Sequence, residues 1–194
     1  MSARRVNADE LSRDKIISKA RFLFEEKGYR AVSMRSIAAE LGCSHGALYY
    51  HFKNKEQLFY GMIEEDFAQL NQIIDTVMAS EEHRAQKLRT LFLRFIEYGL
   101  NNQNQYEFMF LMKGEGVDGL MQSPANESYE KFAQAVFKLM DRPPAIYLIW
   151  SAFLSLHGFV SHFLGYAQSY SEAEAAAENH VTFVLRGLGN EGSC

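Results

Sequence analysis

Apolar side chains recur every three or four positions along most of this chain, the spacing that places them on one face of an α-helix. The sequence shows no strand-like alternation and no internal repeat, so an all-α fold is expected. About nine helices are predicted: one from a Ser12 cap to Lys27, then Arg35–Leu41, His45–Phe52, one beginning at Asn54–Gln57 and ending near Met78, Arg84–Leu100, Gln103–Met112, Ala125–Met140, Ala145–Tyr166, and one capped by Ser171 and Glu174. A flexible loop is predicted at Gly114, Gly116 and Gly119.

The first three predicted helices are expected to share one small core. The first helix stops at Gly28 and turns five apolar side chains inward, namely Ile16, Ile17, Ala20, Leu23 and Phe24. They are expected to pack on apolar side chains of the next two helices, namely Ile37, Leu41, Leu48 and Phe52.

The second and third helices are separated by a three-residue turn. Gly42 stands where a left-handed backbone is favoured, and Ser44 can cap the third helix. Two short helices joined by such a turn are typical of the helix-turn-helix, which lays its second helix in the major groove of DNA.

Charge is distributed unevenly along the 194 residues, whose net charge is −4. Residues 1–60 carry 11 Lys or Arg against 7 Asp or Glu, whereas residues 61–194 carry 9 against 17. A basic first third on an acidic remainder indicates that only the N-terminal part faces phosphate. The polar Met1–Glu10 segment and the two cysteines, Cys43 and Cys194, favour the cytoplasm.

In the predicted helix-turn-helix and the residues on either side of it, the chain resembles the TetR family of bacterial transcriptional regulators. The resemblance rests on Ser33, Ile37-Ala38, Gly42-Cys43, the run Ser44–Phe52, and Lys55-Glu56-Gln57-Leu58. It implies a helix-turn-helix DNA-binding domain over residues 1–56 and a helical effector-binding and dimerisation domain over residues 57–194. It also implies a homodimer, most simply a repressor that leaves a palindromic operator when a small molecule binds.

The resemblance assigns DNA contacts to the turn and its flanks. Ser33, Tyr49, His51 and Lys55 are expected to hold the DNA backbone, and Ser44, His45, Gly46 and Ala47 to lie near base edges. Arg35 could meet a phosphate or a guanine, and either Tyr49 or Tyr50 could instead be a core aromatic. Lys55 is informative because a cation in the first turn opposes the helix dipole, whereas a lysine at a helix N-terminus suits phosphate. Gly46 would cost about 1 kcal/mol relative to Ala in a helix, which suggests close approach to DNA.

The predicted helix Ala145–Tyr166 is the most apolar stretch and is expected to be a buried helix with two different sides. One side carries a small-residue stripe: Ser151, Ser155, Gly158, His162 and Gly165. The opposite side is bulky: Ile146, Trp150, Phe153, His157, Val160 and Leu164. The resemblance implies that the stripe pairs with a second subunit, together with one side of the last helix, at Ala177, Val181 and Val184. The Trp150…His157-Gly158 spacing also resembles a Trp…His-Gly type of C-terminal domain.

Aromatic residues and methionines gather in the helices expected to face that bulky side. Such a set is more often plain core, but the resemblance implies an internal cavity for a small, largely apolar effector. The expected lining is Phe92, Phe95, Tyr98, Phe108, Met109, Met112, Trp150, Phe153 and His157. Arg94 is interpreted as a surface residue beside Glu97.

No common catalytic motif is present in the sequence. GxSxG, HExxH, paired cysteines and a phosphate-binding glycine loop are all absent, and His157 and His162 are too far apart on a helix to share a metal. We therefore expect no enzyme, no cofactor and no metal. The alternative to an operator-binding regulator is a dimeric small-molecule-binding protein of the same fold that has lost operator control.

Overall fold

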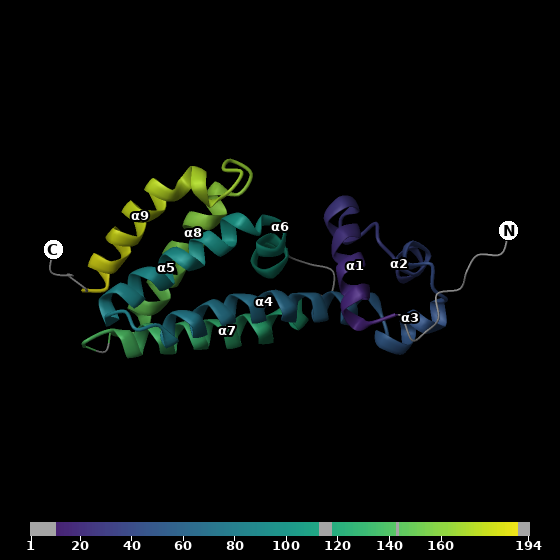
Figure 1. Ribbon diagram of the computed structural model, residues 1–194, viewed down its shortest axis with the longest axis horizontal. Coiled ribbons are helices and arrows are strands. Elements are labelled where there is room, and N and C mark those ends of the chain that lie inside the picture. Colours follow the sequence, from purple (N-terminus) through teal and green to yellow (C-terminus); the bar gives the residue numbers. More distant parts are fainter. Residues whose placement is uncertain (1–10, 113–117, 143, 190–194) are drawn as a thin grey trace. The chain divides into compact units, whose positions relative to one another are not determined.

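The computed structural model describes residues 11–112, 118–142 and 144–189. Predictions about Met1–Glu10, Gly114, Gly116 and Cys194 therefore lie outside the described residues. Within those ranges the chain is helical and contains no strand, which confirms the all-α fold (Figure 1). The elements are α1 Arg13–Lys27, α2 Met34–Leu41, α3 His45–His51, α4 Lys55–Ala79, α5 Arg84–Asn101, α6 Gln103–Tyr106, the π-helical turn η2 Glu107–Leu111, α7 Asp118–Leu139, α8 Ile146–Phe163 and α9 Tyr170–Gly187.

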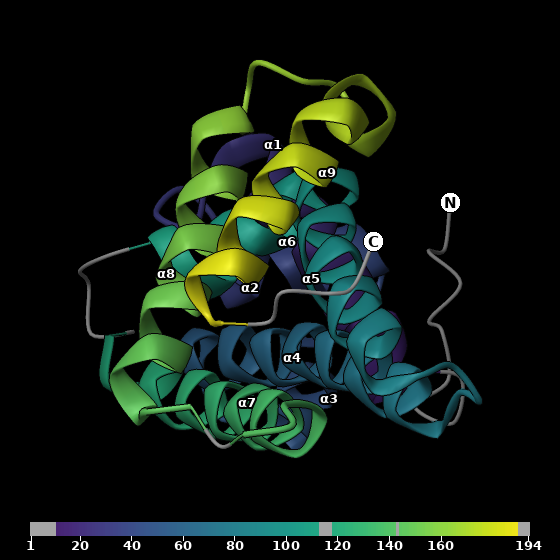
Figure 2. The same ribbon diagram turned by 90° about the vertical axis from the view of Figure 1, so that its left-hand side faces the viewer.

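The chain divides into two compact units. The first comprises residues 1–65 and 113–122, and the second comprises residues 66–112 and 123–194. The described part of the first unit holds α1, α2, α3, the beginning of α4 and the first residues of α7. In the second unit α5, α8 and α9 contact one another pairwise (Figure 2). The expected domain boundary at residue 56 stays a prediction.

The core of the first unit follows the expected pattern. Ser12 Oγ accepts a hydrogen bond from Lys15 N at 3.2 Å and starts α1, and Gly28 ends it with φ 78°. The five inward residues of α1 are buried, as are Ile37, Leu48 and Phe52. Leu41 differs from the prediction, since it is only half-buried at the end of α2.

The start of α4 is capped by side chains on both sides. Gln57 N donates to Asn54 Oδ1 at 2.7 Å, and Lys53 N donates to Gln57 Oε1 at 2.7 Å. The arrangement resembles the predicted capping box, except that Gln57 accepts from Lys53 N and not from Asn54 N.

Two helix starts differ from the sequence prediction. α7 begins at Asp118, so Gly119 lies in a helix and not in a loop, and Pro124 lies inside the helix. Pro124 is buried, and α7 continues through it into the stretch where a helix was predicted to begin at Ala125. α9 begins at Tyr170 after Ser169, and Glu172 Oε2 accepts from Gln168 N at 2.9 Å. The predicted Ser171–Glu174 cap is therefore wrong by two residues.

Helix α8 is not buried as expected. Only 22% of Ile146–Phe163 is buried, on the face formed by Ile149, Ala152, Leu156 and Val160. By length and its mean hydropathy of 1.3, α8 is the one helix among the described residues that could cross a membrane. Several polar residues interrupt it, and its buried face contacts α5 and α9. The described part of the chain therefore leaves most of α8 uncovered.

Candidate nucleic-acid interface

The turn between α2 and α3 is built by local side-chain hydrogen bonds. Ser33 Oγ accepts from Ser36 N at 3.1 Å and Ser36 Oγ accepts from Ser33 N at 2.9 Å, which fixes the start of α2. Gly42 ends α2 in the left-handed region, with φ 64° and ψ 24°. Ser44 Oγ then accepts from Ala47 N at 3.2 Å and starts α3. The predicted helix-turn-helix geometry is confirmed.

Helix α3 contributes one fully buried side chain, Leu48, to the core. Most of the residues expected to meet DNA are exposed: Ser33, Arg35, Ser44, His45, Gly46, Tyr49 and Tyr50. Tyr49 is 41% exposed and Tyr50 is 88% exposed. Neither is therefore a core aromatic residue, which was the alternative that the sequence allowed for one of them. Ala47 and His51 are half-buried. The structure thus brings the predicted residues of α3 to the surface around a single anchoring leucine.

Two features of α3 concern its first turn. The His45 ring lies edge-on to the Tyr49 ring, with 4.6 Å between centroids, so the two side chains support each other at the surface. A Cβ atom added at Gly46 would meet nothing within 4 Å. No packing inside the chain therefore requires a glycine there, and the close approach of DNA to this backbone stays a prediction.

Lys55 makes contacts inside the chain that the sequence did not predict. Its Nζ donates to Tyr29 O at 3.0 Å and to Val32 O at 3.1 Å, and it lies 4.1 Å from the centroid of the Tyr29 ring. The half-buried lysine thus ties the start of α4 to the loop between α1 and α2. Burial, and then the charge of Glu56, raise the pKa of Tyr29 to about 12, so this ring stays neutral. The pairing was not evident from the sequence because its partners are backbone carbonyls 23 and 26 residues away.

Cys43 occupies the turn as a half-buried free thiol. Burial raises the pKa of the Cys43 thiol, which favours the protonated, less reactive form. This agrees with its interpretation as a small turn residue. Among the described residues, no group of three His, Cys, Asp or Glu side chains could hold a metal ion.

The residues expected to line an effector cavity form an aromatic cluster in the second unit. The Phe153 ring lies 5.7 Å from Phe95, 5.6 Å from Trp150 and 6.3 Å from His157, measured between centroids. Phe92, Phe95, Tyr98 and Met109 are buried, whereas Phe108 and Met112 are half-buried. Contacts among these rings connect α5 with α8 in the second unit.

Tyr106 lies at the centre of this cluster, and the sequence did not point to it. Its side chain is fully buried, and its hydroxyl lies 2.7 Å from His157 Nδ1. Burial raises the pKa of Tyr106 well above its usual value and lowers the pKa of His157. The pair is therefore neutral near pH 7, and the tautomer of His157 sets which of the two groups donates.

The residues expected at a dimer interface fall into two groups. Ser151, Gly158, His162 and Gly165 are exposed, and Ser155 is half-buried with its Oγ 3.1 Å from His180 Nε2. Ala177 and Val181 are 0% exposed and Val184 is buried as well. The assignment of those three residues to an interface is wrong, because this side of α9 packs against α5 and α8 of the same chain.

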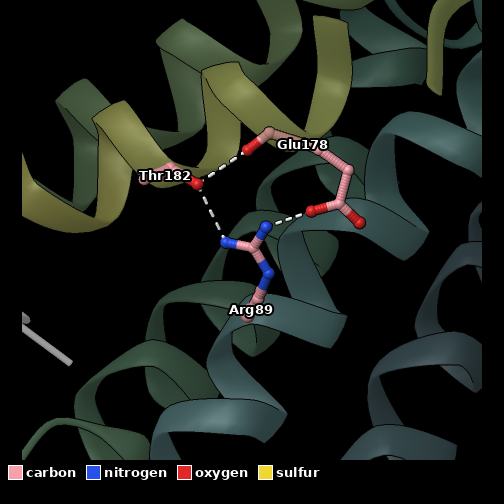
Figure 3. Close-up of polar contacts among 3 residues, drawn as sticks. All are labelled: Arg89, Glu178 and Thr182. Carbon is pink, nitrogen blue, oxygen red and sulfur yellow. Dashed lines mark hydrogen bonds and ion pairs between the residues drawn. The ribbon is translucent and has the colours of Figure 1, made fainter. Parts of the chain in front are cut away.

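A polar contact holds α9 against α5 (Figure 3). Arg89 on α5 pairs with the carboxylate of Glu178, and its Nη1 donates to Thr182 Oγ1 at 3.0 Å. Thr182 Oγ1 in turn donates to Glu178 O at 2.8 Å. The contact lies on the same helix as the buried apolar side chains of α9, whereas Phe183 is 71% exposed.

Parts of this sequence are similar to known regulators. Residues 16–61 match the sequence profile of a family described as bacterial regulatory proteins, tetR family. The TetC protein of transposon Tn10 from Escherichia coli is 32% identical over 87 residues, which are 45% of this chain and 44% of TetC. The HTH-type transcriptional repressor KstR2 of Mycolicibacterium smegmatis is 34% identical over 89 residues, 44% of this chain and 42% of KstR2. The chain thus matches less than half the length of either relative.

A solved structure extends the similarity in fold to most of the chain. FadR from Bacillus subtilis, solved in complex with stearoyl-CoA, superposes with a TM-score of 0.74 at 17% identity, covering 91% of this chain and 99% of FadR. At this identity the likeness shows the fold alone. The resemblance of Trp150…His157-Gly158 to a particular C-terminal domain type stays a prediction. Residues 16–61 thus contain a helix-turn-helix, and their sequence matches the profile of the bacterial regulatory proteins of the tetR family.

Proposed function

We propose that this protein is a transcriptional regulator that binds a palindromic operator as a homodimer. The observation that carries the proposal is the surface of α3, where His45, Tyr49 and Tyr50 are exposed around a glycine with open space beside it. An α-helix presented in this way fits the major groove, where each base pair displays its own pattern of donors and acceptors. The proposed role implies that the protein acts in the cytoplasm, where its DNA is.

The proposed dimer uses the uncovered surface of α8 and the outer side of α9. Tyr147, Leu154 and Phe183 are large apolar side chains that are exposed in the single chain. Beside them a hollow of about 150 Å³ lies between α8 and α9, with Ser151, Ser155 and Gly187 in its wall. Exposed apolar side chains next to a hollow with small residues suit a two-fold interface, in which the same surface meets its own copy.

We further propose that the regulator represses its genes and leaves DNA when a small molecule binds. KstR2, one of the relatives that share the N-terminal part, is named a transcriptional repressor. The alternative, a ligand-binding protein without operator control, predicts no preference among DNA sequences. An enzyme is disfavoured because neither the motifs nor the named relatives point to catalysis.

Selection of bound duplexes from random DNA tests the operator proposal. A near-palindrome should be recovered, with half-sites whose centres are roughly 34–36 Å apart or a multiple of that distance, because a two-fold dimer presents two α3 helices. His45→Ala should change the base preference within each half-site more than it changes affinity for unrelated DNA. Recovery of asymmetric single sites, or of no preferred sequence at all, would favour the alternative.

A further inference from the structure

Helices α4 and α5 line a hollow of about 410 Å³ in the second unit, which shares Tyr98 with the expected effector lining. Most of the lining residues are polar, but apolar atoms contribute the larger part of the lining surface: Gln69, Gln72, Ile73, Thr76 and Val77 come from α4, and Arg94, Glu97, Tyr98, Asn101 and Asn102 from α5 and the residue after it. This volume accommodates a small metabolite. The chemistry of the lining residues therefore determines which class of molecule can bind.

The only charged residues in the lining form one ion pair. Arg94 Nη1 donates to Glu97 Oε2 at 2.6 Å, one helical turn apart, and the Arg94 side chain is exposed. An exposed ion pair of this kind contributes little to the free energy of folding. Arg94 and Glu97 can therefore give up their contact with each other and bind charged groups of a ligand instead. The pair offers one cation and one anion side by side, which matches a molecule that carries both charges and no net charge.

The amide side chains in the lining supply both donors and acceptors. Asn101 Oδ1 accepts from Tyr170 N at 3.0 Å, which leaves its amide N–H groups for a ligand. Asn102 Nδ2 donates to Tyr98 O at 2.9 Å, which leaves its carbonyl oxygen. The side-chain amides of Gln69 and Gln72 make no hydrogen bond to other residues in the described part of the chain. The hollow can thus offer a ligand both hydrogen-bond donors and hydrogen-bond acceptors.

Apolar side chains complete one part of the lining. Val77 is buried and Ile73 is half-buried, and both belong to the same face of α4. The Tyr98 hydroxyl is occupied by Asp66 O at 3.0 Å, so this residue offers mainly its ring. A hydrocarbon group of a few carbons finds its apolar contacts here.

We propose that this hollow binds a free α-amino acid with an apolar side chain. Its carboxylate pairs with Arg94, its ammonium group pairs with Glu97, and its side chain packs on Ile73 and Val77. A fatty acid or an acyl thioester, which has no ammonium group, fits this lining poorly. That the bound amino acid is the effector rests on the proposed function, whereas the binding itself does not.

Calorimetric titration of the intact protein without DNA tests the binding. The probes are L-leucine, L-methionine and L-phenylalanine, each compared with its decarboxylated amine and its deaminated acid. At least one of the amino acids should bind, and both of its singly charged counterparts should bind about tenfold more weakly or worse, because each loses a charge-assisted hydrogen bond. Arg94→Gln and Glu97→Gln should each weaken amino-acid binding by a similar factor.

Lys131→Gln is the matched control. It removes another exposed ion pair, Lys131 Nζ to Asp75 Oδ2 at 2.6 Å, whose members do not line the hollow. This variant should bind like the wild type, and circular dichroism should show all three variants folded. Absence of binding for all three amino acids at 10 mM, or binding that survives both Arg94→Gln and Glu97→Gln, would overturn the inference. DNA binding measured on the same samples reports separately on the proposed function.

Discussion

The internal role of Lys55 makes a prediction that separates stability from DNA binding. Lys55→Met keeps most of the aliphatic stem but removes the ammonium group that donates to Tyr29 O and Val32 O and lies over the Tyr29 ring. Hydrogen bonds from a charged donor contribute about 1.5–3 kcal/mol each when well buried. Since Lys55 is half-buried and water can replace part of these contacts, we expect a total loss of roughly 2 kcal/mol.

Urea unfolding followed by circular dichroism measures that loss, with Lys53→Met as the control. Lys53 is exposed and lies two residues away, so its substitution should change the free energy of unfolding by less than about 0.5 kcal/mol. The slope of log affinity for DNA against log salt should stay unchanged in folded Lys55→Met, because the ammonium group is occupied inside the protein. A slope reduced by roughly one unit with unchanged stability would refute this reasoning and make Lys55 a phosphate contact.

Three further predictions concern the second unit. Burial lowers the pKa of His157 below its usual 6.5, so the unfolded chain binds more protons than the folded chain below that pH. The free energy of unfolding should therefore fall as the pH falls below about 6.5, and His157→Phe should reduce this pH dependence in urea unfolding. Gly158→Leu should leave the single chain folded, since a Cβ there meets nothing within 4 Å, but it should shift sedimentation of the proposed dimer toward the monomer; an unchanged dimer would place the interface elsewhere. Phe183→Ser should weaken the dimer in the same assay, whereas Ala177→Ser, inside the chain, should lower the free energy of unfolding instead.

The N-terminal unit could be predicted from the sequence because its signals are local. Ser12, Ser33 and Ser44 each accept a hydrogen bond from a backbone N–H three residues ahead, and Gly42 takes the left-handed conformation that its place after α2 favours. Spacing alone reveals such partners. The exposure of the α3 residues follows as well, since one buried leucine fixes which side of a short helix faces the core.

The features that the sequence did not reveal depend on partners far along the chain. Tyr106 and His157 are hydrogen-bonded although 51 residues separate them in the sequence, and Arg89 and Thr182 are hydrogen-bonded over a separation of 93 residues. No local pattern in the sequence points to either contact. One side of α9 packs against α8 and against α5, which lies far before α9 along the chain. The same reason explains the error at Ala177: periodicity shows that a face is apolar, but it does not show which element covers it.

The most direct test of the central claim, that α3 reads an operator, is equilibrium binding of the intact protein to its selected palindrome and to a scrambled duplex of equal length. Both affinities are to be measured at the same salt concentration by fluorescence anisotropy. We predict that one dimer binds the palindrome about 10³-fold or more tightly than the scrambled duplex. Equal affinity for the two duplexes would contradict the account.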